Sequence, residues 1–195
     1  MGDSMSSIVV SGDTSGAITI AAPAVSGTNT LTLPAATGTI LTTASGSQSV
    51  PRAAMPAGSI LQVVSATTTT YVTANSTTYV DSTLTASITP TTSTSKILVM
   101  INQGIGTSGS GNVGSIKLVR NSTDVQTWGF GIFYTGASDL YGYSSNTYLD
   151  SPASTSSVTY KTQFNRTAGG GTTRVQYSDG NGSQVSTITL MEVAA

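Results

Sequence analysis

Short strand signals recur along most of this chain, and no helical signal accompanies them. From Ser59 onward, apolar or alternating segments separated by turn residues recur about every ten to fifteen residues. No segment of ten or more residues has the apolar spacing of an amphipathic helix. Short strands with turn signals at this spacing are typical of antiparallel sandwiches. We therefore expect an all-β chain whose C-terminal part is an antiparallel, jelly-roll-like β-sandwich.

Ten segments of the C-terminal part have strand character: 60–64, 71–72, 78–88, 96–101, 115–120, 125–134, 139–148, 157–164, 173–177 and 185–193. The run Ile97–Ile101 is apolar at every position, which predicts a central strand buried on both faces. The run Tyr160–Phe164 alternates instead, which predicts a strand with one face in water.

Two glycine-rich segments have the form of ligand loops. Gly104–Gly109 fits the spacing of a dinucleotide-binding loop, but the chain continues into another strand and not into the helix that such a loop needs. We interpret it as a long loop between strands. Asp179–Gly182 has the beginning of a calcium loop without the rest of the ligands, and it is predicted to be a hairpin turn.

The aromatic residues divide the chain in two. All twelve lie between Tyr71 and Tyr177, so the N-terminal part has too little apolar surface to fold as a lone monomer. It nevertheless carries short apolar-Thr-apolar strands, two of them ended by a proline. We interpret residues 8–43 as intermolecular β-structure, formed between copies of the chain. The apolar positions for trimer or docking contacts are Ile18, Ile20, Leu31, Leu33, Ile40 and Leu41.

Composition along the chain predicts three parts. Residues 1–50 form an N-terminal segment that makes contacts between copies of the chain, and residues 51–58 form a linker rich in Pro, Gly and Ala. Residues 59–195 form the β-sandwich knob. Limited proteolysis is expected to release a stable knob by cutting near Arg52, because such linkers have few contacts with the domains beside them.

Charge and composition exclude several function classes. The 195 residues include seven basic and eight acidic side chains, so the chain has no positive excess for a nucleic acid. Without Cys or His it has no thiol nucleophile, no disulfide and none of the usual transition-metal ligands. No run of about 18 apolar residues predicts a membrane span.

The acidic residues give no sign of catalysis. Glycoside hydrolysis needs two carboxyl groups close together, whereas the candidate acids stand singly in the sequence: Asp81, Asp124, Asp139 and Asp150, with Glu192 as the one glutamate. We expect no enzymatic activity, no cofactor and no metal site.

The densest aromatic region begins at Trp128. Trp128, Phe130, Ile132 and Tyr134 alternate along one predicted strand, which favours a role in the core or in subunit contacts. Tyr141, Tyr143 and Tyr148 follow in the next predicted strand. Two interpretations of these three tyrosines stay open: core packing, or a rigid surface that stacks on sugars of a host glycan.

Residues 15–42 resemble an N-terminal module of virion proteins from tailed bacteriophages, notably those of marine and freshwater hosts. The resemblance is carried by Ser15–Pro23, Thr28–Pro34 and Gly38–Thr42. Residues 56–193 are similar to the C-terminal β-sandwich knobs of fibre-like proteins from the same viruses. This resemblance implies a homotrimer on the virion surface, made in the cytoplasm of the bacterial host. Its N-terminal part would dock on other virion proteins of the tail or capsid.

The resemblance leaves two roles open. One is a fibre-like appendage that contributes to host attachment, and the other is a decoration or cement protein that stabilises the capsid. The chain departs from long tail fibres, because the extended shaft of those proteins is absent from it. Between the two roles, we favour the fibre-like appendage.

Overall fold

The computed structural model describes residues 7–11, 17–21, 55–109, 111–135, 139–179 and 182–195. The chain divides into two compact units, residues 1–48 and 49–195. In the first unit, β1 (Ser7–Ser11) and β2 (Ala17–Ala21) pair as an antiparallel hairpin within one chain. The expected contact positions Ile18 and Ile20 lie in β2, opposite Val10 and Ile8. Leu31, Leu33, Ile40 and Leu41 lie outside the described residues, as do residues 51–54 of the predicted linker.

The second unit is built from strands alone within the described residues. Each of the ten predicted segments overlaps one strand, and the all-β fold class is confirmed. The strands are β3 (Ile60–Thr68), β4 (Val72–Ala74), β5 (Val80–Ile88), β6 (Lys96–Ser108), β7 (Asn112–Arg120), β8 (Thr123–Thr135), β9 (Asp139–Asp150), β10 (Val158–Ala168), β11 (Thr172–Val175) and β12 (Ser186–Val193).

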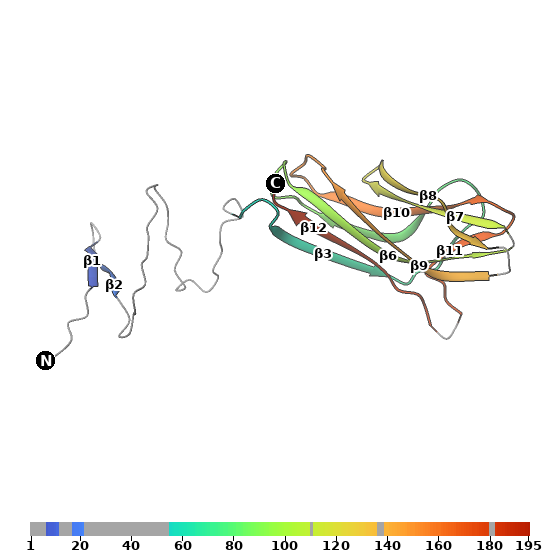
Figure 1. Ribbon diagram of the computed structural model, residues 1–195, viewed down its shortest axis with the longest axis horizontal. Coiled ribbons are helices and arrows are strands. Elements are labelled where there is room, and N and C mark those ends of the chain that lie inside the picture. The colour runs from blue at the N-terminus through green and yellow to red at the C-terminus, as the bar shows by residue number, and fades with distance from the viewer. Residues whose placement is uncertain (1–6, 12–16, 22–54, 110, 136–138, 180–181) are drawn as a thin grey trace. The chain divides into compact units, whose positions relative to one another are not determined.

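The strands form two antiparallel sheets that pack face to face (Figure 1). The larger sheet has the order β3-β12-β6-β9, with β11 and β4 continuing beside the end of β6, and the smaller has the order β5-β10-β7-β8. All strands of this unit except β4 and β11 have eight or more residues. When these eight long strands are numbered 1 to 8 in chain order, the order is 1-8-3-6 in the larger sheet and 2-7-4-5 in the smaller sheet. This is the strand order of a jelly roll, as predicted.

The core lies between the two sheets, where alternate side chains of β5, β10 and β12 are buried. One cluster is centred on Leu84, Ile97 and Tyr160, and a second on Ile105 and Phe164. Trp128 packs against both clusters, as its predicted core role requires. Each fully buried large apolar side chain contributes about 1.5–3 kcal/mol to stability. The side chains of Phe130, Ile132 and Tyr134 are outside the described part.

The prediction that Ile97–Ile101 is buried on both faces is wrong. Ile97, Val99 and Ile101 face the core, but Met100 is 44% exposed on the outer face of the sheet. Strand β6 is central because β12 and β9 pair with its two edges, yet no described element covers its outer face. Strand β10 does have one wet face as predicted: Tyr160, Thr162 and Phe164 are buried, and their neighbours point outward.

The prediction of a long loop at Gly104–Gly109 is also wrong. Strand β6 continues to Ser108, and Gly109 and Gly111, which precede β7, have φ angles of 85° and 68°. Glycine permits these left-handed conformations without steric cost. The predicted hairpin turn is consistent with the bridge that pairs Ser178 with Ser183.

Candidate functional site

Three tyrosines from distant parts of the chain meet on the outer face of the larger sheet. The ring of Tyr141 stacks on that of Tyr177, with centroids 4.1 Å apart and an angle of 22° between the planes. Tyr71 meets Tyr177 edge to face at 6.0 Å. Arg174 lies over the rings of Tyr141 and Tyr177 at 5.9 and 5.8 Å. We call Tyr71, Tyr141, Tyr177, Arg174 and the neighbouring Asp139 the tyrosine cluster.

Strand pairing at Gly106 brings the two halves of the cluster together. Gly106 of β6 stands opposite Arg174 of β11 on one side and opposite Tyr141 of β9 on the other. A Cβ atom at Gly106 would lie 2.5 Å from the carbonyl oxygen of Leu140 and 2.7 Å from the ring of Tyr141. The missing side chain therefore lets Tyr141 and Arg174 meet across β6.

The segment after β11 carries Tyr177 over the same face. Gln176 is buried at a φ of 51°, which bends the chain, and its N–H donates to the Gly104 carbonyl at 3.0 Å. The N–H of Gln184 donates to the Tyr177 carbonyl at 2.9 Å, and its side-chain amide donates to the Gly142 carbonyl at 3.0 Å. The Gln184 side chain thus crosses β6 above Gly104, where an added Cβ would be 2.6 Å away.

Polar contacts fix the cluster and leave it without net charge. The Arg174 Nη1 donates to the Tyr141 hydroxyl at 2.7 Å, and that hydroxyl donates to the Asp139 carboxylate at 3.0 Å. Arg174 and Asp139 also form an ion pair at 3.4 Å. Burial raises the pKa of Tyr141 well above its usual range, and the bond to Asp139 adds to this effect. The hydroxyl therefore stays protonated at neutral pH.

Replacing Gly106 by Ala is expected to displace Tyr141 and to lower the free energy of unfolding by about 1–3 kcal/mol, as overpacking does. The near-ultraviolet circular dichroism of the stacked tyrosines should weaken as well. Gly170 is the matched control, because no atom lies within 4 Å of an added Cβ there. Gly170→Ala should change stability by no more than about 0.5 kcal/mol. Equal effects of the two substitutions would contradict the packing described for Gly106.

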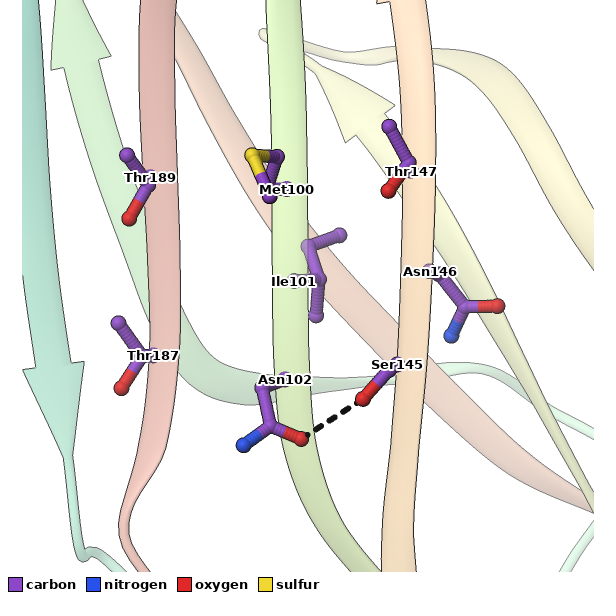
Figure 2. A pocket seen from close by; sticks show the side chains of 8 residues that line it. All are labelled: Met100, Ile101, Asn102, Ser145, Asn146, Thr147, Thr187 and Thr189. Atoms are coloured by element: carbon purple, nitrogen blue, oxygen red, sulfur yellow. Dashed lines mark hydrogen bonds between the residues drawn. The ribbon is translucent and has the colours of Figure 1, made fainter.

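A shallow groove of about 280 Å³ lies beside the cluster, on the same outer face. Figure 2 shows side chains from three neighbouring strands along it. Thr189, Met100 and Thr147 form one cross-strand row, and Thr187, Asn102 and Ser145 form the next. The Ser145 hydroxyl donates to the Asn102 side-chain oxygen at 3.0 Å.

The structure separates the three tyrosines predicted as a surface. Tyr141 belongs to the cluster, and Tyr143 is 51% exposed two residues further along the same face of β9. Tyr148 points to the opposite face and packs against the core, because side chains alternate along a strand and five positions separate it from Tyr143. Tyr71, Tyr177 and Arg174 were not predicted as site residues. The one signal for them in the sequence is a pair of opposite charges. Asp139 lies two residues before Tyr141, and Arg174 lies three residues before Tyr177.

Four of the acidic residues each form an ion pair. Asp81, Asp124, Asp139 and Asp150 each form an ion pair with a different base: Lys161, Lys117, Arg174 and Arg120 respectively. Among the described residues, no three acidic side chains gather where they could hold a metal ion. The same residues include no helix long and apolar enough to cross a membrane.

No protein-family model and no curated protein matches the chain. Solved structures with a similar chain include infectious bursal disease virus, Gt strain, at 14% identity and a TM-score of 0.32, covering 70% of this chain and 39% of that one. The D431N mutant VP2 protein of the same virus covers 70% and 37% at 14% identity and a TM-score of 0.33. Latent PorU from Porphyromonas gingivalis covers 71% and 14% at 11% identity and a TM-score of 0.30. The chain thus spans well under half the length of each.

Proposed function

We propose that the chain is a non-enzymatic structural protein of a bacteriophage particle: a homotrimeric, fibre-like appendage on the virion surface that contributes to host attachment. The observation that carries this proposal is the division of the chain into two unlike units. The small N-terminal unit contains β2, which lies within the segment that resembles phage virion modules. The larger unit is a jelly roll, a fold used by lectins and by viral capsid proteins.

The N-terminal hairpin supports the trimer. Two strands alone are at best marginally stable in water, and the pairs Ile8–Ile20 and Val10–Ile18 place four apolar residues on β1 and β2. Contacts between copies would remove this apolar surface from water. Multi-angle light scattering of the full-length chain at micromolar concentration should therefore give the mass of a trimer. A monomeric mass under these conditions would contradict the proposed trimer.

Copy number separates an appendage from a capsid component. Particles purified from an infected culture are labelled with an antibody against residues 59–195 and viewed by immunogold electron microscopy, and the protein is quantified on a gel. A fibre is expected at about a dozen to a few dozen copies per particle, clustered at defined positions. Particles that lack the protein would overturn the virion role altogether.

A capsid decoration protein is the second candidate, and one observation favours it. Val63, Met100 and Leu149 are 56%, 44% and 49% exposed on the outer face of the larger sheet. A cement protein buries such apolar surface against its neighbours on the capsid. Hundreds of copies spread over the capsid would establish this role and exclude the fibre.

A further inference from the structure

We propose that the tyrosine cluster, Tyr143 and the adjoining groove form one binding surface for an uncharged oligosaccharide. The inference rests on the proposed attachment role, for which it names the chemical class of the receptor. The three parts lie in sequence along the outer face of the larger sheet, because Thr147, Ser145, Tyr143 and Tyr141 follow one another at every second position of β9.

Charge decides which class of ligand fits. The outward positions of β3, β12, β6 and β9 in and around the groove carry no charged side chain: Val63, Ser65, Thr67, Leu98, Met100, Asn102, Ser145, Thr147, Leu149, Thr187, Thr189 and Met191. The charged side chains of this face lie away from the groove: Arg174 and Asp139 pair with each other in the tyrosine cluster, and Lys96 lies at the start of β6, two cross-strand rows beyond Met100. An anionic polysaccharide would lose hydration on the groove without gaining a counter-charge.

The groove offers hydrogen bonds that suit sugar hydroxyls. The Ser145 hydroxyl donates a hydrogen bond to the side-chain oxygen of Asn102, whereas the Asn102 amide nitrogen has no hydrogen-bond partner among the described residues. The hydroxyls of Thr187, Thr189 and Thr147 line the same groove in Figure 2. Each hydroxyl both donates and accepts, so it matches either polarity of a sugar hydroxyl.

The tyrosines supply the apolar part of the contact. A pyranose ring has a face of C–H bonds that packs flat against an aromatic ring, and Tyr143 is exposed for such packing. Tyr gives this contact area at a low cost in conformational entropy. The Gln184 side chain crosses β6 at Gly104, between the groove and the tyrosine cluster, and Tyr177 stacks on Tyr141 beyond it. From Thr147 to Tyr141 the strand spans about 20 Å, which is long enough for several sugar units.

The experiment measures binding of the full-length chain to immobilised soluble starch, dextran, laminarin and mannan as uncharged glycans, and to polygalacturonate as an acidic one. At least one uncharged glycan is expected to bind, and polygalacturonate is expected not to compete. Thr147→Arg should reduce binding at least tenfold, because it fills the groove. Ser87→Arg is the matched control: it places the same side chain on an exposed strand position of the smaller sheet, and binding should stay unchanged.

A second pair of variants tests the aromatic contact. Tyr143→Ala is expected to weaken binding about tenfold, whereas Tyr143→Phe, which keeps the ring, should stay within about twofold. Thermal unfolding of both variants checks that the fold is intact. A loss in Tyr143→Phe equal to that in Tyr143→Ala would show that the ring face is not the contact.

Three results would overturn the proposal. They are no binding to any uncharged glycan, equal competition by polygalacturonate, and a change of oligomeric mass in Thr147→Arg. The third result would assign this face to a contact between copies of the chain. Immunogold labelling of particles is independent of all three, so labelled particles without glycan binding would contradict this inference and leave the virion role standing.

Discussion

Replacing Asp150 by Ala is expected to lower the free energy of unfolding by about 3–5 kcal/mol, the loss typical of breaking a buried ion pair. Asp150, at the end of β9, is only 5% exposed. Its two carboxylate oxygens accept from the Arg120 Nη1 at 2.9 and 2.8 Å, and one accepts from the buried Tyr160 hydroxyl at 2.6 Å. The substitution leaves both donors without this acceptor. Chemical denaturation of the full-length chain measures the loss.

An exposed ion pair provides the control. Asp124 pairs with Lys117 at 2.8 Å, but its side chain is 57% exposed. Asp124→Ala should therefore cost less than about 1 kcal/mol. Similar losses for Asp150→Ala and Asp124→Ala would contradict the special role of the buried carboxylate.

The second large effect is expected at Glu192. This glutamate of β12 is fully buried, and its carboxylate accepts hydrogen bonds from the Gln62 side chain at 2.5 Å and from the Thr91 N–H at 2.5 Å and hydroxyl at 3.0 Å. Hydrogen bonds to charged groups contribute about 1.5–3 kcal/mol each, and donors left buried without an acceptor are costly. Glu192→Ala should lower the free energy of unfolding by about 3 kcal/mol. A loss below about 1 kcal/mol would contradict this account.

Glu192 should also make stability depend on pH. Burial alone would raise the pKa of its carboxyl group, but hydrogen bonds from Ser95, Gln62 and Thr91 outweigh burial and hold the pKa below the ordinary value of 4.5. A group with a lowered pKa in the folded state stabilises the fold above its unfolded pKa. That stability is lost as pH falls through the folded pKa.

The pH effect is measured by comparing the full-length chain with Glu192→Gln. The unmodified chain should lose stability more steeply than the variant as pH falls below about 4.5. The pKa of Asp81 is also lowered, chiefly by its hydrogen bond to Lys161. Its effect on stability is the same in both proteins and therefore cancels when their pH profiles are subtracted. Parallel pH profiles would show that Glu192 is not responsible.

The strands were predictable because the signals for them are local. Alternation in Tyr160–Phe164 and turn residues at Asp179–Gly182 each act over a few positions. Gly104–Ser108 was missed because glycine-rich composition is typical of loops, whereas here Gln184 and Tyr141 lie over glycines within a strand. Gln184 and Tyr141 are distant from these glycines in the sequence, so local composition does not predict that they pack on them.

The candidate site was only partly predictable for the same reason. Tyr141, Tyr143 and Tyr148 stood out as a local concentration of tyrosine and were grouped for that reason, although the two-residue period of a strand puts Tyr148 on the other face. Tyr71 and Tyr177 lie far from them in sequence, and only the pairing of β11 and β9 with the two edges of β6 brings the cluster together. A single sequence does not contain that register.

The position of β12 between β3 and β6 governs when this domain can fold during synthesis. Gln62 and Glu192, which are bonded to each other across this pairing, are 130 positions apart. Among the described strands β3 pairs with β12 alone, so β3 leaves the ribosome long before its partner has been made. The central β6 lacks the same partner on one edge until then. Such long-range pairing folds slowly and exposes unpaired strand edges in the meantime. Newly made chains are therefore expected to be most prone to aggregation before β12 has been made, when β3 and β6 lack this partner.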